Sequence, residues 1–85
     1  MKLRKEFITQ NMGGEQIMVA TGGKFSGMVR SNATAAYIVD LLKEETSKEE
    51  ILEKMLAQYD APRSVIEPDV DKVIGTLRSI GALEE

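Results

Sequence analysis

The sequence of 85 residues contains no cysteine and no histidine. Without cysteine the chain has no disulfide framework and no thiolate nucleophile. Without histidine it lacks the side chain that most often acts as a general base or metal ligand near neutral pH. No pair of side chains has the pattern of a nucleophile with its base. These absences predict a protein that is not an enzyme and that binds no metal or other cofactor.

Positive charge and long apolar runs are also scarce. The 11 basic residues are outnumbered by 14 acidic ones, so there is no basic excess to neutralise phosphates. No apolar run approaches the ~20 residues of a membrane span, and the basic start at residues 1–6 lacks the apolar stretch of a signal peptide. We expect a cytoplasmic, soluble protein that binds neither nucleic acid nor membrane. Its length predicts a single domain over residues 1–85, with one thin core and no deep catalytic pocket.

Three short β-prone segments occupy the first third of the chain. They cover residues 7–9, 16–21 and 25–31, and paired glycines between them mark turns. This predicts a meander of three antiparallel strands. The run at residues 22–26 loosely resembles a phosphate-binding loop, but it lacks the required spacing and leads into no helix. A turn between strands is therefore the preferred interpretation.

Two helices follow the strands. Asn32 is a good N-cap for a helix over residues 33–43. A capping box opens the second helix, with Ser47 as the N-cap and Glu50 three residues later. Each helix has apolar residues at helical spacing, which predicts one buried face. These faces are Ala35, Ile38, Val39 and Leu42 in the first helix, and Ile51, Leu52, Met55, Leu56 and Tyr59 in the second.

A third apolar stripe lies near the chain end, with Gly81 as its expected terminator. Its members are Ile66, Val70, Val73, Ile74, Leu77 and Ile80. Pro68 falls inside this segment, where it removes an amide donor and clashes with the preceding turn. We expect a short turn over residues 63–66 and a main helix that starts near Glu67. A helix kinked at Pro68 is the alternative.

Strands first and helices afterwards predict the α+β class, with helices packed on one face of a small sheet. The acidic cluster Glu67, Asp69 and Asp71 raises the question of a metal site. Asp69 and Asp71 are two residues apart and point in different directions on a helix. We expect a solvated helix start instead, where acidic residues suit the positive end of the helix dipole.

The third strand is the candidate binding element. Residues 27–31 contain no proline and only one charge, Arg30, so at a sheet edge this strand is unguarded. A peptide can add there as a further strand, with backbone hydrogen bonds giving affinity and side-chain pockets giving specificity. Met28 lies on this strand, and methionine suits adaptable binding surfaces. The alternatives are that a helix or a second copy of the protein covers the edge.

Short motifs in a characteristic order run along residues 3–84. They include Val19-Ala20-Thr21-Gly22 at a strand end, Ser47-Lys48-Glu49-Glu50-Ile51 at a helix start and Gly81-Ala82-Leu83 at the chain end. Together they resemble the PqqD-like family, also called RiPP precursor recognition elements. The chain departs from the family pattern at Ala20, Ser31 and Val39, where the family often has proline, leucine and tryptophan.

The resemblance implies a winged-helix-like arrangement of three antiparallel strands followed by three helices. It implies that the leader region of a ribosomally made precursor peptide adds along the third strand, in a groove against the third helix. A partner maturase, often a radical SAM enzyme, then acts on the bound precursor. The implied peptide-binding residues are Met28, Val29, Arg30, Ser31, Val70, Val73, Ile74 and Leu77.

Within the last helix the members of the stripe divide between two roles. A stripe roughly 100° wide cannot face the sheet with every member, so some must flank the core and meet the peptide. We expect Val70 or Val73 to lie at the groove, and Ile74 and Leu77 to lie in the core.

Two other functions compete with peptide binding. One is a structural homodimer, formed by pairing the third strand with itself. The other is a winged-helix nucleic-acid binder, but the last helix offers only Lys72 and Arg78 against three acidic residues.

Overall fold

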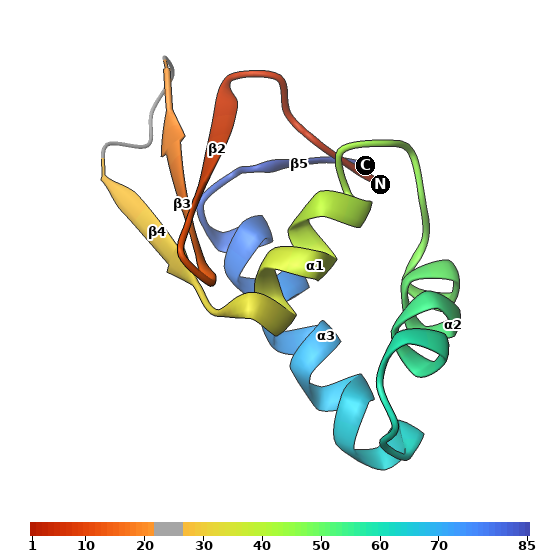
Figure 1. The fold of residues 1–85 in the computed structure, drawn as a ribbon. Coiled ribbons are helices and arrows are strands. Elements are labelled where there is room, and N and C mark those ends of the chain that lie inside the picture. The colour runs from red at the N-terminus through yellow and green to blue at the C-terminus, as the bar shows by residue number, and fades with distance from the viewer. Residues whose placement is uncertain (22–26) are drawn as a thin grey trace.

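The computed structural model describes residues 1–21 and 27–85. The elements are β1 (Lys2–Leu3), β2 (Phe7–Met12), β3 (Glu15–Ala20), β4 (Met28–Ser31), α1 (Ala33–Leu41), α2 (Lys48–Gln58), α3 (Arg63–Ser79) and β5 (Leu83–Glu84). The predicted order of three strands and then three helices is confirmed, and so is the α+β class (Figure 1). The phosphate-loop-like run at 22–26 lies outside the described residues, as does the beginning of the predicted third strand.

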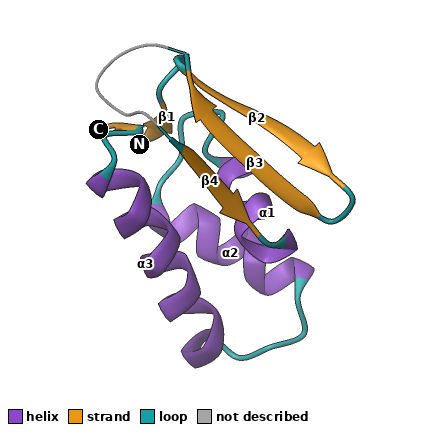
Figure 2. Ribbon diagram, turned by 90° about the vertical axis from the view of Figure 1, so that its left-hand side faces the viewer, coloured by secondary structure: helices purple, strands orange, loops and turns teal. Residues whose placement is uncertain are grey.

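The main sheet is antiparallel in the order β2-β3-β4, and the helices cover one of its faces (Figure 2). The register pairs Met18 with Val29 and Gln16 with Ser31. Met18 and Gln16 are buried while Val29 and Ser31 are half-buried. Because side chains alternate along a strand, this set faces the helices. Met28 belongs to the opposite face and is exposed.

A second sheet, which the sequence analysis did not anticipate, joins the two ends of the chain. β1 and β5 pair antiparallel, with Leu3 opposite Leu83. Both leucines are buried. The amide of Leu3 donates to the Leu42 carbonyl at 2.7 Å, which attaches this sheet to the end of α1. Strands of two residues give too weak a pattern to predict, so only the folded chain reveals the pair.

The predicted caps of α1 and α2 are confirmed. The side chain of Asn32 accepts a hydrogen bond from the amide of Ala35 at 2.9 Å. The Ser47 hydroxyl accepts from the amide of Glu50 at 3.2 Å. Each cap satisfies a backbone donor that has no partner inside the helix, so both helices start where the local sequence specifies.

The predicted start of α3 is wrong. The helix begins at Arg63, so residues 63–66 form its first turn, and Pro68 lies inside it. The Pro62 carbonyl accepts the first helical bonds, from Val65 and Ile66 at 3.0 and 3.2 Å. Ile66 is buried and anchors this turn in the core. Pro68 is exposed, so the helical bond that it cannot donate is lost where water can replace it.

The predicted end of α3 at Gly81 is confirmed. Gly81 has a φ of 72°, which favours glycine. Its amide donates to the Arg78 carbonyl at 3.1 Å, and the Ala82 amide donates to the Leu77 carbonyl at 2.8 Å. These two bonds form a Schellman motif, which satisfies carbonyls at the helix end. The motif turns the chain back toward β1.

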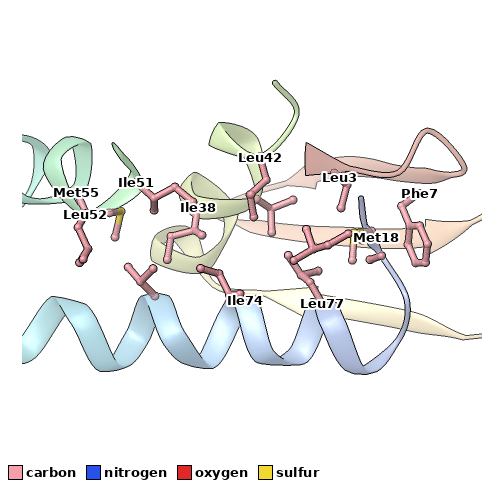
Figure 3. Close-up of a cluster of buried hydrophobic side chains, with 14 of the residues drawn as sticks. Leu3, Phe7, Met18, Ile38, Leu42, Ile51, Leu52, Met55, Ile74 and Leu77 are labelled. Carbon is pink, nitrogen blue, oxygen red and sulfur yellow. The ribbon is translucent and has the colours of Figure 1, made fainter. Parts of the chain in front are cut away.

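The core lies between the sheet and the three helices (Figure 3). From α3, Ile74 and Leu77 point into it, toward α1 and the sheet. The buried residues are Leu3, Phe7, Met18, Ile38, Val39, Leu42, Ile51, Leu52, Met55, Ile66, Val70, Ile74, Leu77, Ala82 and Leu83. The predicted faces of α1 and α2 therefore supply most of their members to the core, although Leu56 is exposed.

No helix in residues 1–21 or 27–85 is long and apolar enough to cross a membrane.

Gln16 is the one polar side chain among the buried residues that the structure describes, with 1% exposure. Its Nε2 donates to Asp40 Oδ1 at 3.0 Å and to Asn11 Oδ1 at 3.2 Å. Its Oε1 is buried and has no hydrogen-bond partner among the described residues. This amide therefore connects β3 to α1 but leaves one acceptor unsatisfied. Burying that acceptor without a partner lowers the free energy of unfolding.

We predict a coupling of about 1–3 kcal/mol between Gln16 and Asp40. Asp40→Ala removes the charged acceptor and leaves the buried amide poorly satisfied. In a Gln16→Met background no amide remains, so the same change should cost little. Urea unfolding of the wild type, both single variants and the double variant measures this difference. Equal costs of Asp40→Ala in the two backgrounds would contradict it.

Candidate functional site

β4 lies at an edge of the main sheet. Within the described part of the chain, no strand pairs with its far side. The strand that the sequence predicts to be unguarded if it lies at a sheet edge is therefore an edge strand. Such an edge presents unpaired N–H and C=O groups to its surroundings.

A groove with a volume of about 300 Å³ separates β4 from α3. Figure 2 shows β4 and α3 running in opposite directions. The lining from β4 and the residue after it is Val29, Arg30, Ser31 and Asn32. α1 contributes Thr34, Ala35 and Val39, and α3 contributes Asp69, Lys72, Val73, Thr76 and Leu77.

The floor of the groove is apolar. Val39 and Leu77 are both 2% exposed and belong to the core as well as to the lining. Val29 and Val73 are half-buried and stand above them on the two walls. An apolar side chain that entered the groove would bury further surface against these residues, at about 25 cal/mol per Å².

The rim of the groove is polar. Arg30 on β4 and Asp69, Lys72 and Thr76 on α3 are exposed. The groove thus has the composition of a binding site, with an apolar interior and a few polar groups around it.

The structure brings five of the eight predicted peptide-binding residues to this groove. They are Val29, Arg30, Ser31, Val73 and Leu77. Val70 and Ile74 are 0% and 4% exposed and lie in the core behind it. Met28 is exposed on the outer face of the sheet. Of Val70 and Val73, Val73 is therefore the residue at the groove, and the role of all eight residues in binding stays a prediction.

Several lining residues were missed by the sequence analysis. On α3, Asp69, Lys72 and Thr76 join Val73 in a row with helical spacing. This row lies beside the apolar stripe, so its spacing could have indicated that these residues share one face of the helix. On α1, Thr34 and Val39 gave no such signal, because a helix pattern does not tell which neighbour a face meets.

The acidic cluster has a different role from the one predicted. α3 begins at Arg63 and has no acidic residue in its first turn, so the helix-start explanation is wrong. Lys48 on α2 instead contacts Asp71 at 2.8 Å and Glu67 at 3.0 Å. Arg63 lies 3.5 Å from Glu67. Glu67 and Asp71 thus form ion pairs with Lys48 of α2, Glu67 forms another with Arg63 within α3, and Asp69 stands apart from them at the groove.

These ion pairs shift the titration of their members. Hydrogen bonds to Asp71 and then to Glu67 raise the pKa of Lys48 above its ordinary value. The bond from Lys48 lowers the pKa of Glu67. This part of the α2–α3 contact is therefore fully present between the ordinary pKa of a glutamate and that of a lysine; it is lost as the pH falls through the lowered pKa of Glu67 or rises through the raised pKa of Lys48. In the described ranges, no group of His, Cys, Asp and Glu side chains could hold a metal ion.

Comparison with known proteins finds a matching family and a matching fold. The family model described as coenzyme PQQ synthesis protein D (PqqD) matches residues 15–83. A solved structure described as TbiB1 in complex with the TbiA(beta) leader peptide has the same fold, with a TM-score of 0.83 and 23% sequence identity. The match covers 99% of this chain and 95% of the other. No curated protein sequence matches the chain.

The placement of neighbouring residues on α3 predicts a contrast in stability. Ile74→Ala should cost about 2–5 kcal/mol of unfolding free energy, because it leaves a cavity in the core. Val73→Ala should cost less than about 1 kcal/mol, since its side chain is half-buried at the groove. Both changes gain similar helix propensity, so each is a control for the other. Urea unfolding measures both, and equal losses would show that Val73 is a core residue.

Proposed function

Because this chain belongs to the PqqD family, we propose that it binds the leader region of a ribosomally synthesised precursor peptide as a strand added to β4. The observation that carries the proposal is the free edge of β4 beside a groove with an apolar floor. The similar fold of TbiB1, whose structure contains a leader peptide, supports it.

The geometry of a sheet tells where such a peptide would lie. Neighbouring strands are about 4.7–4.9 Å apart, so a strand paired with β4 would run along the groove between β4 and α3. Its backbone would satisfy the unpaired groups of β4. Every second side chain would point to the floor, toward Val39, Val73 and Leu77. Val29 and Ser31, which face the helices, would flank those side chains.

We propose further that the chain presents the bound peptide to a separate modifying enzyme, such as a radical SAM maturase, and has no catalytic role itself. The groove lining contains hydroxyl groups on Ser31, Thr34 and Thr76. None of them is hydrogen-bonded, within the part of the chain that the structure describes, to a side chain that could serve as its base. A groove of this kind can bind and orient a peptide, and the chemistry must then come from the partner.

The same free edge could be used by a second copy of the chain, with β4 pairing to β4. The two uses exclude one another, because one edge accepts one strand. Mass measurement with and without peptide separates them: peptide binding predicts a monomer that takes up one peptide, and the alternative predicts a dimer that peptide does not bind or dissociates.

We predict that one of two proline variants loses peptide binding while staying folded. Amides of consecutive strand residues point to opposite sides, so one of Val29 and Arg30 donates toward β3 and the other toward the free edge. Proline at the edge-facing position removes a donor for the peptide and leaves the β3 ladder intact.

The measurement uses a peptide that the wild-type chain selects from a random dodecapeptide library. The folded proline variant should bind this peptide at least about tenfold more weakly, a loss of ~1.4 kcal/mol. Circular dichroism identifies which variant is folded. Unchanged affinity in the folded variant would sink the strand-addition model.

A second prediction concerns catalysis. A leader-bearing precursor incubated with this chain alone should keep its mass, and should change only when a maturase is added. Mass spectrometry of the precursor checks this. Any covalent change produced by the purified chain would overturn the proposed division of roles.

A further inference from the structure

Two basic residues line the groove from opposite sides, and the side chain of Arg30, which alternates with those of Val29 and Ser31, lies toward the outer face of the sheet. Arg30 extends from β4 and Lys72 from α3, and both are exposed. In the described part of the molecule neither forms an ion pair. Both charges are therefore available to a ligand.

The other cations on α3 are occupied. Arg63 contacts Glu49 and Glu67, and Arg78 contacts Glu85 at 2.7 Å. Lys72 is the basic residue of this helix that has no carboxylate partner. The chain as a whole has a net charge of −3. At the groove, however, Lys72 keeps a positive charge, whereas the charges of Arg63 and Arg78 are neutralised by carboxylates.

Among the described lining residues Asp69 is the one carboxylate, so these residues together with Arg30 and Lys72 carry a net positive charge. Asp69 precedes Lys72 by three residues, about 4.5 Å along the helix axis. Because β4 and α3 run in opposite directions (Figures 1 and 2), Asp69 lies toward the end where β4 passes into α1. The charge of the groove is therefore uneven along its length, with its negative group at one end.

Resting on the proposed function, we infer that the groove selects leader peptides with an aspartate or glutamate held between Arg30 and Lys72. Both cations are at the rim, so the acidic side chain must point away from the floor. Successive side chains of a strand point to opposite sides, so the residues on either side of the acid point to the apolar floor. The preferred segment therefore reads apolar–acidic–apolar.

Burial of the two apolar side chains supplies most of the affinity, and the charge supplies the selection. Complementary charges at an exposed rim change specificity and the salt dependence more than they change total affinity. The acidic position also sets the register of the peptide, because a shift by one residue would place the acid over Val39 and Leu77.

The first test pans a phage-displayed random dodecapeptide library against the intact chain. Wild type should enrich the apolar–acidic–apolar pattern. Lys72→Glu should lose the acidic preference or replace it with a basic one. Lys54→Glu is the matched control, since Lys54 is an exposed cation on α2 outside the groove and should leave the pattern unchanged.

The outcomes distinguish a failure of peptide binding from a failure of the acidic preference. If no peptide is enriched by any variant, the proposed function itself fails. If apolar peptides are enriched without an acidic position, peptide binding stands and the inference about Arg30 and Lys72 is wrong.

The second test measures a charge swap. A selected peptide and its acid-to-lysine counterpart are titrated against wild type, Lys72→Gln and Lys72→Glu, with circular dichroism as the folding control. Lys72→Glu should weaken the acidic peptide about five- to tenfold and strengthen the lysine peptide, with Lys72→Gln between. The difference should shrink in 0.5 M salt, where charges are screened within about 4 Å. Equal weakening of both peptides would overturn the inference.

Discussion

The rotation of α3 about its own axis is the constraint on which the rest of the structure depends. Four of its residues, Ile66, Val70, Ile74 and Leu77, are buried. Together they make a stripe that admits one orientation of the helix against the core. Once that stripe is buried, the neighbouring row from Asp69 to Thr76 must turn toward β4. The same packing that stabilises the fold therefore builds one wall of the groove.

The sheet contributes the other wall by remaining open. β4 has only four residues, and among residues 1–21 and 27–85 a strand pairs with one of its sides only. A short edge strand is one of the ways in which proteins limit unwanted strand pairing. Its inward side chains, Val29 and Ser31, lie opposite the buried Met18 and Gln16, so the register of the sheet fixes which side of β4 meets the groove. The short edge that limits unwanted strand pairing is thus also the edge at which we propose that the peptide binds.

Position-specific local chemistry explains which predictions were confirmed. Asn32, Ser47 and Gly81 each act on backbone groups within a few residues, and each cap or terminator is found where it was expected. The prediction for Pro68 failed because it considered the free-energy cost of a proline within a helix and not the stabilisation from burying Ile66. Burial of Ile66 extends the helix through the proline, which the structure places at an exposed position. Helix propensity predicts a helix boundary poorly where a residue nearby in the sequence is buried in the core.

The sequence by itself determined the order of the main-sheet strands and the helices, the caps at Asn32, Ser47 and Gly81 and most of the core, because these follow from periodicity and from bonds between near neighbours. The family motifs, read from the same residues, also pointed to β4 and α3 as the proposed site. Only the tertiary structure decided that Val73 rather than Val70 faces the groove, and that Lys72 and Arg30 share it. A helical pattern defines a face, but its orientation is set by the packing of residues far apart in the chain, and one residue's step of about 100° separates a core side chain from a groove side chain.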